Sequence, residues 1–516
     1  MTYAMTQPVA NLAQALLHTA RLLPDQNGLS RGDHSWSWGE LAARAQSLAA
    51  ALAAKGIGKG DRVLVHSRNS PAMVEAMWAV FTLGAVWVPT NNRLTPPEVA
   101  YLAEASGAKL FLCDGAFPEH AAALRPIEQW EIGGDHWEAA ATSGARASVA
   151  EVVYDDPAWF FFTSGTTGRS KAAVLTHGQL TFVMNNHLAD LFPGLTTAVS
   201  ALVAAPLSHA AGLHMLAHTA RGVRTVITAS DSLDPAEVWR LIEQERVATL
   251  FTVPTLLKRL VEHPAVDLHD KSSLSAVLYA GAPMYRADQK RAYEKLGEAL
   301  VQYYGLGEVT SNITVLPGWM HKEVLDGDEA GAGTCGYVRT GMEIAILDAE
   351  GAALETGQIG EICVRGPAVF AGYHNNPDAN AKAFRGGWFH TGDLGFLDAR
   401  GLLTITGRES DMYISGGSNV YPRETEELLI AHPAVLEAAV VGVPDPEWGE
   451  IGIAAVVLKP GAQATDQELA AYLDGKLARY KRPRRFVFWP ELPKSGYGKI
   501  PKNLIRDKLR ADGVIS

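Results

Sequence analysis

The sequence predicts an α/β protein: a large N-terminal domain of layered helices and mostly parallel strands, followed by a small α+β domain. Two observations predict this fold. The chain has 516 residues, which exceeds what one hydrophobic core usually organises, so at least two domains are expected. Apolar strand-like runs also alternate with helical patterns along most of the chain, and this alternation is typical of helices packed on parallel sheets.

Several elements can be predicted individually. Short apolar runs predict strands at 63–65, 109–112, 159–162 and 200–204. Asp234 followed by Pro235 predicts the start of a helix, because Asp caps free backbone N–H groups and Pro suits the first turn. Residues 133–146 are polar and rich in Gly and Ala, so we expect a surface connection there.

Residues 71–89 are apolar and approach the length of a membrane span. Glu75, Gly84 and the two bounding prolines favour a buried helix followed by a buried strand instead. We therefore expect no segment of the chain to cross a membrane.

The best domain boundary lies near Arg408, which gives predicted domains of 1–408 and 409–516. A strand pattern at 402–406 ends there in a glycine and a charged stretch. Beyond it, strand runs at 435–443 and 453–458 and helical patterns at 422–430 and 466–477 suffice for a small α+β domain with its own core. The glycine-flanked boundary also permits the small domain to move.

Composition restricts the class of protein. With 47% hydrophobic and 20% charged residues, the chain has the composition of an ordinary globular protein. The three cysteines, Cys113, Cys335 and Cys363, follow no disulfide or metal-ligand spacing, and the first twenty residues lack the features of a signal peptide. We therefore expect a cytoplasmic protein. The sequence leaves the oligomeric state open.

Charge is unevenly distributed. The formal net charge of −11 argues against nucleic acid as a general partner. Residues 476–510 nevertheless contain twelve Lys or Arg against two acidic residues, Glu491 and Asp507, which is a local charge of +10. This run is either a solvated basic face or a surface that attracts the phosphates of ATP or CoA.

The run from Thr163 to Lys171 (TSGTTGRSK) has the chemistry of a phosphate-binding loop. It follows the aromatic strand pattern at 159–162. Gly165 and Gly168 free the backbone to turn its N–H groups toward an anion, hydroxyl groups add donors, and Lys171 adds a mobile positive charge. The spacing differs from the Walker A loop. A surface turn remains the alternative, since Gly, Ser and Thr clusters are typical of loops.

Five further segments follow this loop in a fixed order: 304–308 (YGLGE), 387–393 (GWFHTGD), 407–411 (GRESD), 415–417 (SGG) and 493–500 (PKSGYGKI). With these motifs the chain resembles the adenylate-forming superfamily, which holds acyl-CoA synthetases, adenylation domains of nonribosomal peptide synthetases and firefly-type luciferases. The block 411–422 is most similar to the acyl-CoA synthetase branch. The resemblance extends over nearly the whole chain.

The resemblance implies a site for ATP and Mg²⁺. It assigns Glu308 to the metal, a role that suits a hard carboxylate oxygen. It places Tyr304 against the adenine, and Asp393, assisted by Arg408, at the ribose. The residues implied in ATP or AMP binding are Thr163, Ser164, Gly165, Thr166, Thr167, Gly168, Lys171, Gly281, Ala282, Pro283, Tyr304, Gly305, Asp393, Arg408 and Lys499.

Two further residues are implied in catalysis beside Glu308. Lys499 would neutralise the charge that develops at the α-phosphate, and His209 would lie beside the substrate carboxylate. Both inferences rest on the positions of Lys499 and His209 within the motifs. A solvated lysine in a basic region and a satisfied structural histidine remain the alternatives.

The small domain is implied to deliver CoA after a rotation about Ser410. The residues implied in CoA binding are Ser415, Gly416, Gly417, Trp448 and Lys481. Paired glycines allow a narrow pantetheine arm to approach the backbone closely. An exposed Trp448 that only caps the small domain remains the alternative.

Three residues depart from the superfamily pattern. Ser170 replaces the common proline of the phosphate loop, and Ala172 replaces a common glycine. Gly307 replaces the common threonine before Glu308. This last change removes a hydroxyl group that the resemblance places at the adenylate phosphate.

We therefore expect an ATP-dependent, AMP-forming acyl-CoA synthetase. The segments 210–215 and 279–281 would line the acid pocket, and their small, apolar character favours a hydrophobic acid, fatty or aryl. Two alternatives stay open: an adenylation enzyme that loads a carrier-protein thiol, and a non-catalytic nucleotide sensor. A sensor would be expected to lose Lys499 or Glu308, and both are present.

Overall fold

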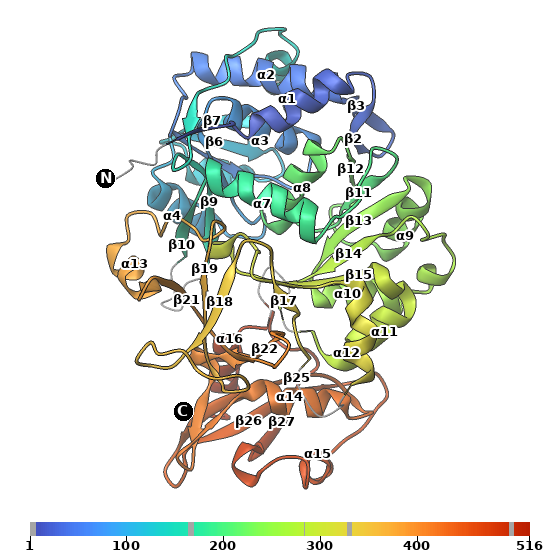
Figure 1. The fold of residues 1–516 in the computed structure, drawn as a ribbon, viewed down its shortest axis with the longest axis vertical. Helices are drawn as coiled ribbons and strands as arrows, with labels where there is room; N and C mark the ends of the chain where they lie inside the picture. Colours follow the sequence, from blue (N-terminus) through green and yellow to red (C-terminus); the bar gives the residue numbers. More distant parts are fainter. Residues whose placement is uncertain (1–6, 164–169, 283, 328–332, 495–499, 516) are drawn as a thin grey trace.

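The computed structural model describes residues 7–163, 170–282, 284–327, 333–494 and 500–515. Figure 1 follows the chain from the blue elements at the top, through the green sheet in the middle, to the orange and red elements at the bottom. The described residues form two large sheets, two five-stranded sheets and a short pair, β1 (Pro8–Val9) with β8 (Val152–Val153).

The first large sheet has six strands: β4 (Arg62–His66), β5 (Val86–Pro89), β6 (Leu110–Asp114), β7 (Glu128–Ile132), β9 (Pro157–Thr163) and β10 (Lys171–Thr176). Their order is β10-β9-β5-β4-β6-β7. The pairings are parallel except for β9 with β10, which form an antiparallel pair. The strands predicted at 63–65, 109–112 and 159–162 are confirmed.

The second large sheet has nine strands: β2 (Asn27–Arg31), β3 (His34–Ser37), β11 (Ser200–Val203), β12 (Arg224–Ile227), β13 (Val247–Thr252), β14 (Ala276–Tyr279), β15 (Leu300–Tyr304), β16 (Thr314–Leu316) and β17 (Tyr337–Val338). Their order is β17-β16-β15-β14-β13-β11-β12-β2-β3. The central pairings, from β15 to β2, are parallel, as predicted. The strand predicted at 200–204 is β11.

A third sheet is antiparallel: β18 (Glu343–Leu347), β19 (Gly360–Arg365), β20 (Phe384–Arg385), β21 (Trp388–Leu397) and β22 (Leu403–Arg408). The predicted strand at 402–406 lies in β22. This sheet matters for the site because β21 and β22 pair Asp393 with Arg408.

Helices pack against these sheets. They are α1 (Ala13–Leu22), α2 (Trp38–Ala54), α3 (Pro71–Thr82), α4 (Pro96–Ser106), α5 (Pro118–Ala123), α6 (Asp135–Ala141), α7 (His177–Asp190), α8 (Ala210–Ala220), α9 (Pro235–Gln244), α10 (Pro254–Glu262), α11 (Arg286–Leu296), α12 (Gly318–Asp326) and α13 (Pro377–Ala383). α9 begins as predicted, because Asp234 Oδ1 accepts from the N–H of Ala236 at 2.9 Å.

The last sheet lies at the bottom of Figure 1. Its strands are β23 (Tyr413–Ser415), β24 (Ser418–Val420), β25 (Val435–Asp445), β26 (Gly449–Leu458) and β27 (Arg485–Phe488). Helices α14 (Pro422–Ala431), α15 (Asp466–Leu473) and α16 (Lys502–Ala511) accompany it. Two separate clusters of buried apolar side chains belong to this unit. The predicted α+β content of the C-terminal part is confirmed.

Residues 71–89 form α3 and β5 and are buried, as predicted. In the described part of the chain, no helix is long and apolar enough to cross a membrane. Glu75 lies on α3 and is buried, where it forms an ion pair with Arg44 of α2. Burial raises the pKa of Glu75, and Arg44 opposes that shift.

The prediction of a surface connection at 133–146 is wrong in part. Residues 135–141 form α6, and Trp137 on this helix is fully buried. The Trp137 indole donates to Glu75 Oε2 at 2.9 Å. A polar, Ala-rich segment can form a helix when one large side chain packs into the core. Local composition does not predict such packing.

We expect Arg44→Ala to lower the free energy of unfolding by about 3 kcal/mol, because it leaves the buried Glu75 carboxylate without its cation. Urea denaturation measures this. Glu138→Ala is the matched control, since Glu138 is an exposed partner of the same arginine and its loss should cost less than about 1 kcal/mol. Equal losses in the two variants would contradict a special role for the buried pair.

Candidate active site

The segment predicted as a phosphate-binding loop lies between two antiparallel strands. Thr163 ends β9, Lys171 begins β10, and the two residues are paired in register. The predicted residues Ser164, Gly165, Thr166, Thr167 and Gly168 lie outside the described residues. Thr163 Oγ1 donates to Glu308 Oε1 at 2.8 Å. The Lys171 Nζ lies 5.2 Å from the centroid of the Tyr373 ring. The two ends of the loop therefore meet Glu308 and its neighbour Tyr373.

Glu308 is buried in a one-turn 3₁₀ helix (Gly307–Val309) that follows β15. The Tyr373 hydroxyl donates to the same oxygen, Oε1, at 3.0 Å. Burial and the Glu308 charge raise the pKa of Tyr373, so its hydroxyl stays protonated and remains a donor. An anchored carboxylate beside Thr163 is an oxygen donor set that fits a hard cation such as Mg²⁺.

A second cluster joins Tyr304, Asp393 and Arg408. The Tyr304 hydroxyl donates to Asp393 Oδ2 at 2.6 Å, and Arg408 Nε donates to Asp393 Oδ1 at 3.0 Å. The Asp393 charge raises the pKa of Arg408, and burial followed by the same charge raises the pKa of Tyr304. The structure thus brings together the three residues that the sequence assigned to the nucleoside.

Backbone geometry explains why two positions near this cluster are glycine. A Cβ on Gly305 would lie 2.4 Å from the backbone of Ser311, so the chain can pass there only as glycine. Gly281 has φ +85° in the bend after β14, and Ala282 follows it. The predicted residue Pro283 lies outside the described residues.

His209 precedes the first residue of α8 and occupies its N-cap position. Its Nδ1 lies 3.1 Å from Ser208 Oγ. Its ring packs edge to face against Phe161, with 5.0 Å between the ring centroids. Phe161 belongs to β9, so His209 lies close to the strand that carries Thr163.

Phe161 also explains why residue 307 is glycine and not the threonine that is common in the superfamily. A Cβ on Gly307 would lie 2.6 Å from Phe161 Cδ1 and 2.9 Å from Thr163 Cγ2. The phenyl ring therefore fills the space that a threonine side chain would need. Sequence reasoning found the missing hydroxyl but missed its cause, because residues 161 and 307 meet only in the folded chain.

The predicted CoA-binding residues lie on the last sheet. Ser415 ends β23 and is buried, and Gly416 and Gly417 form the turn to β24 with φ of +57° and +78°. A Cβ on Gly416 would lie 3.0 Å from Trp448 Cε3. The guanidinium of Arg484 lies 4.5 Å from the centroid of the Trp448 ring. Trp448 is thus packed between a turn and a cation.

Three further predicted residues belong to the C-terminal part of the chain: Lys481, Ser410 and Lys499. Lys481 forms an ion pair with Glu424, with Nζ 2.7 Å from Oε2. Ser410 is exposed in a 3₁₀ turn (Glu409–Asp411) directly after β22. The predicted catalytic residue Lys499 lies outside the described residues.

One cluster has the composition of a metal site: Glu361, Cys363 and His390. Two observations argue against that use. Burial and the Glu361 charge raise the pKa of the Cys363 thiol to about 12, which keeps it protonated. Arg385 Nη2 also lies 2.9 Å from His390 Nδ1, so a cation already occupies this position.

Two parts of the chain match family descriptions. Residues 16–374 match the AMP-binding enzyme family, and residues 424–499 match the AMP-binding enzyme C-terminal domain. The chain belongs to the AMP-binding enzyme family. The predicted adenylate-forming superfamily and the predicted combination of a large α/β domain with a small C-terminal domain are confirmed.

Similar proteins agree with this assignment. The chain is 37% identical to a feruloyl-CoA synthase from an Amycolatopsis species over 95% of this chain and 97% of the relative. It is 33% identical to a long-chain-fatty-acid–CoA ligase of Mycobacterium tuberculosis over 93% and 94%. The ATP-bound crystal structure of MatB from Rhodopseudomonas palustris matches with a TM-score of 0.86 and 30% identity, over 96% and 99%. The predicted class, an AMP-forming carboxylate–CoA ligase, is confirmed.

We expect Gly307→Ala to lower the free energy of unfolding by about 1–3 kcal/mol, because the new methyl group overlaps the Phe161 ring. In a chain that already carries Phe161→Ala, Gly307→Ala should cost much less, because the ring that the methyl group overlaps is absent. Thermal or urea denaturation of the single and double variants measures the coupling.

Gly58→Ala is the control, because a Cβ there meets no atom within 4 Å. If the losses of stability in Gly307→Ala and Phe161→Ala are additive, the Phe161 ring is not what excludes a side chain at residue 307.

Proposed function

We propose that this chain is an ATP-dependent, AMP-forming acyl-CoA synthetase that activates a hydrophobic carboxylic acid, fatty or aryl, as an acyl-adenylate and transfers the acyl group to CoA. One observation carries the proposal: the segment 304–308 joins two clusters. At one end Tyr304 contacts Asp393, and at the other Glu308 contacts Thr163. Four residues of chain thereby separate the proposed nucleoside site from the proposed site for the phosphates and the metal.

The first half-reaction joins two anions, so the site has to neutralise charge and hold the acid oxygen in line with the α-phosphorus. We assign Thr163 and Lys171, together with the loop between them, to the β- and γ-phosphates. Glu308 would hold Mg²⁺, which when bound would supply charge neutralisation between phosphates. Tyr373 supports that assignment, because its hydroxyl fixes the carboxylate that faces Thr163.

We assign nucleoside binding to Tyr304, Asp393 and Arg408. The ionised Asp393 keeps acceptor capacity for ribose hydroxyl groups, since a carboxylate accepts more bonds than these two partners supply. Gly281, Ala282 and Pro283 would provide the backbone beside the adenine, and Gly305 lets its own segment pass close to the Ser311 backbone.

His209 is assigned to the acid carboxylate, and Lys499 to the α-phosphate. The position of His209 at the start of α8 supports the first assignment, because it borders segment 210–215, which we assign to the acid pocket. For Lys499 the support is the motif at 493–500.

The second half-reaction needs the CoA thiol to reach the acyl-adenylate. We propose that the chain divides after Arg408 and that the small domain turns about Ser410, which is exposed directly after β22. Ser415, Gly416, Gly417 and Trp448 would then form the path of the pantetheine arm. Lys481 would bind the CoA phosphates only after its ion pair with Glu424 is broken.

Two other functions are less well supported. The matched relatives include a fatty acid–acyl-carrier-protein ligase from Streptomyces coeruleorubidus, but the relatives with higher identity carry CoA-ligase names. A non-catalytic sensor would not need Glu308 to be anchored by two hydroxyl donors. We also propose a cytoplasmic location, on the composition and cysteine usage of the chain.

We expect Glu308→Gln to raise the Mg²⁺ concentration required for half-maximal adenylation by about tenfold or more, because a neutral amide holds a hard cation less well. Pyrophosphate exchange against a Mg²⁺ titration measures this. Tyr373→Phe is the matched variant: it removes one donor to Glu308 and should produce a smaller shift in the same direction. An unchanged Mg²⁺ dependence in Glu308→Gln would remove Glu308 from the metal site.

The half-reactions test the function itself. The wild-type protein should convert acid, ATP and CoA to acyl-CoA, AMP and pyrophosphate. Lys499→Ala should slow adenylation by about a hundredfold or more, because a cation at the reacting phosphate is lost. It should leave thioester formation from supplied acyl-adenylate largely intact. Trp448→Ala should instead slow the thioester step and spare adenylation.

Lys494→Ala is the control for Lys499, because Lys494 belongs to the same motif but pairs with Glu437. Acyl-adenylate that accumulates without thioester when CoA is present would favour loading of a carrier protein. Equal damage to both steps in Lys499→Ala and Trp448→Ala would contradict the alternating use of the small domain.

A further inference from the structure

Helix α14 of the C-terminal unit contacts the rest of the protein at two places. Figure 1 shows α14 below β22 and α11. Arg423 Nη1 donates to the carbonyl oxygen of Ile405 in β22 at 3.0 Å. One turn further along α14, Glu427 Oε2 accepts from the backbone N–H of Arg286, the first residue of α11, at 3.4 Å. Both partners precede Arg408, the proposed end of the large domain.

Arg423 and Glu427 also pair with each other. They are four residues apart and therefore share one face of α14, and Arg423 Nε lies 3.5 Å from Glu427 Oε1. Their side chains are only 11% and 13% exposed. Burial raises the pKa of Glu427, and the charge of Arg423 and the N–H of Arg286 oppose that shift. The Glu427 carboxylate is therefore stabilised by one partner on its own helix and by one on the large domain.

At α11, Glu427 acts as a helix cap that comes from the other domain. The first N–H groups of a helix have no partner within the helix, and a carboxylate there also interacts favourably with the positive end of the helix dipole. The N-cap residue of α11, Tyr285, forms no cap bond with its side chain. α9 differs, because Asp234 precedes it directly in the chain and caps it. α11 thus takes from the small domain a cap that α9 has in its own segment.

Tyr285 adds a third contact between the domains. Its hydroxyl donates to the carbonyl oxygen of Ala438 in β25 at 3.5 Å. Tyr285 lies two residues after Pro283, in the segment whose backbone we assign to the adenine. The start of α11 therefore connects the small domain to the proposed nucleoside site.

The same contact positions the segment that carries the proposed catalytic lysine. Lys494, at the start of the motif at 493–500, has its Nζ 2.6 Å from Glu437 Oε1 of β25. Lys502, just after the motif, forms an ion pair with Glu426 of α14. Each of these two glutamates is next in sequence to a residue that contacts the start of α11. Both flanks of the motif are therefore tied to the contact between the domains.

The glycine turn assigned to CoA has its contacts within the small domain. The Gly416 N–H donates to the Trp448 carbonyl oxygen at 2.9 Å, and the Trp448 N–H donates to Asp445 Oδ1 at 2.9 Å. In this structure the motif with Lys499, rather than the turn with Gly416, is tied to the contact with the large domain. This orientation is the one that the proposed first half-reaction requires.

We propose that Glu427 is a positioning residue for adenylation, which caps α11 and thereby holds the small domain in the orientation that presents the Lys499 motif to the nucleotide. The cap has to open before the small domain turns about Ser410 to deliver CoA. The inference rests on the proposed function, because it uses the two proposed half-reactions. It names a contact that favours one orientation over the other.

The two half-reactions, measured separately, test this role. Adenylation is measured from acid and ATP, and thioester formation from supplied acyl-adenylate and CoA. Dodecanoic acid and 3-phenylpropenoic acid are the probes, and the acid that the wild-type protein converts faster is used throughout. Each step uses its own orientation, so the ratio of the two rates follows the ratio of the two populations. This ratio does not depend on the fraction of active protein.

We expect Glu427→Ala to lower the ratio of adenylation to thioester formation by about fivefold, which corresponds to the loss of a typical helix cap. Glu427→Gln should lower the ratio less, because an amide oxygen still accepts from the Arg286 N–H but carries no charge. Tyr285→Phe should also lower the ratio slightly, because it removes the contact with β25. If Glu427→Ala does not fold, these two variants still report on the ratio.

Asp234→Ala is the matched control, because it removes the cap of α9 within the large domain. It should lower the thermal stability and leave the ratio at the wild-type value. An unchanged or higher ratio in Glu427→Ala overturns the inference and leaves the acyl-CoA synthetase function in place. An equal fall in Asp234→Ala also overturns it, because loss of any helix cap would then have the same effect.

Failure of the proposed function has a different signature. If the wild-type protein forms a CoA thioester from neither probe nor from a panel of other fatty and aryl acids, the proposed function is overturned, and this inference with it.

Discussion

The site depends on one constraint, which is that the segment 304–308 is anchored at both ends. Tyr304 is bonded to Asp393 of the antiparallel sheet, and Glu308 is bonded to Thr163 of the six-stranded sheet. The segment itself continues the nine-stranded sheet. Three sheets are therefore tied together through one short turn, and hydrogen bonds to charged groups, which are stronger than neutral ones, form these ties. Rigid placement of this kind is what in-line transfer to phosphorus requires.

The same arrangement brings the proposed nucleotide site close to the proposed hinge. Arg408 is the last residue of β22, and Ser410 follows it in the 3₁₀ turn. Asp393 holds Arg408 on the large-domain side. In the proposed mechanism, a change of partner at Asp393 when nucleotide binds or leaves would therefore act on Arg408, two residues before the proposed hinge at Ser410. This proximity gives a physical route from the state of the nucleotide to the position of that domain.

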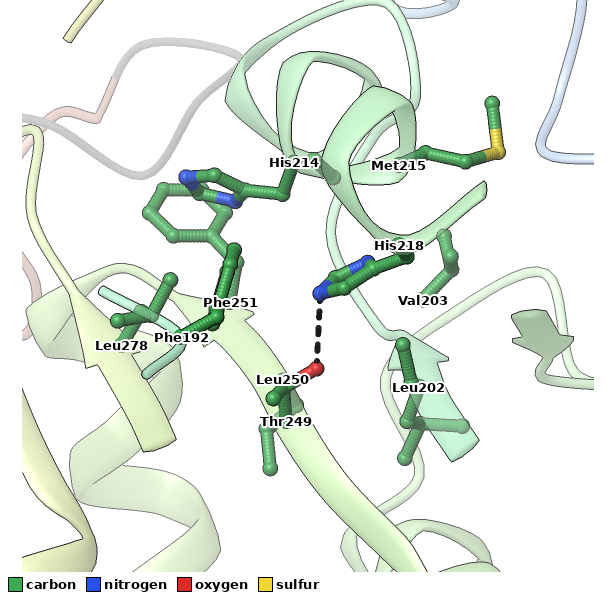
Figure 2. A pocket seen from close by; sticks show the side chains of 12 residues that line it. Phe192, Leu202, Val203, His214, Met215, His218, Thr249, Leu250, Phe251 and Leu278 are labelled. Carbon is green, nitrogen blue, oxygen red and sulfur yellow. Dashed lines mark hydrogen bonds between the residues drawn. The ribbon is translucent and has the colours of Figure 1, made fainter. Parts of the chain in front are cut away.

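The surroundings of Phe161 and His214 reflect a different balance of forces. Phe161 occupies the space beside Gly307, so an apolar ring lies where the superfamily pattern has a threonine side chain. On α8, His214 lies within an aromatic cluster (Figure 2), and its ring nitrogens have no hydrogen-bond partner among the described residues. Leaving such atoms unpaired costs stability.

The sequence alone determined the class of fold, the order of the motifs and the identity of the residues that carry charge and donors, because strand alternation, glycine turns and acidic or basic residue types are local properties. It identified Glu308, Asp393 and Arg408 but not Tyr373 or Phe161, and it took 133–146 for a connection although Trp137 anchors a helix there. Only the tertiary structure decided which oxygen of Glu308 is held, why residue 307 is glycine and that His214 has no hydrogen-bond partner among the described residues. Each of these depends on contacts between residues far apart in the chain, and no local pattern encodes such contacts.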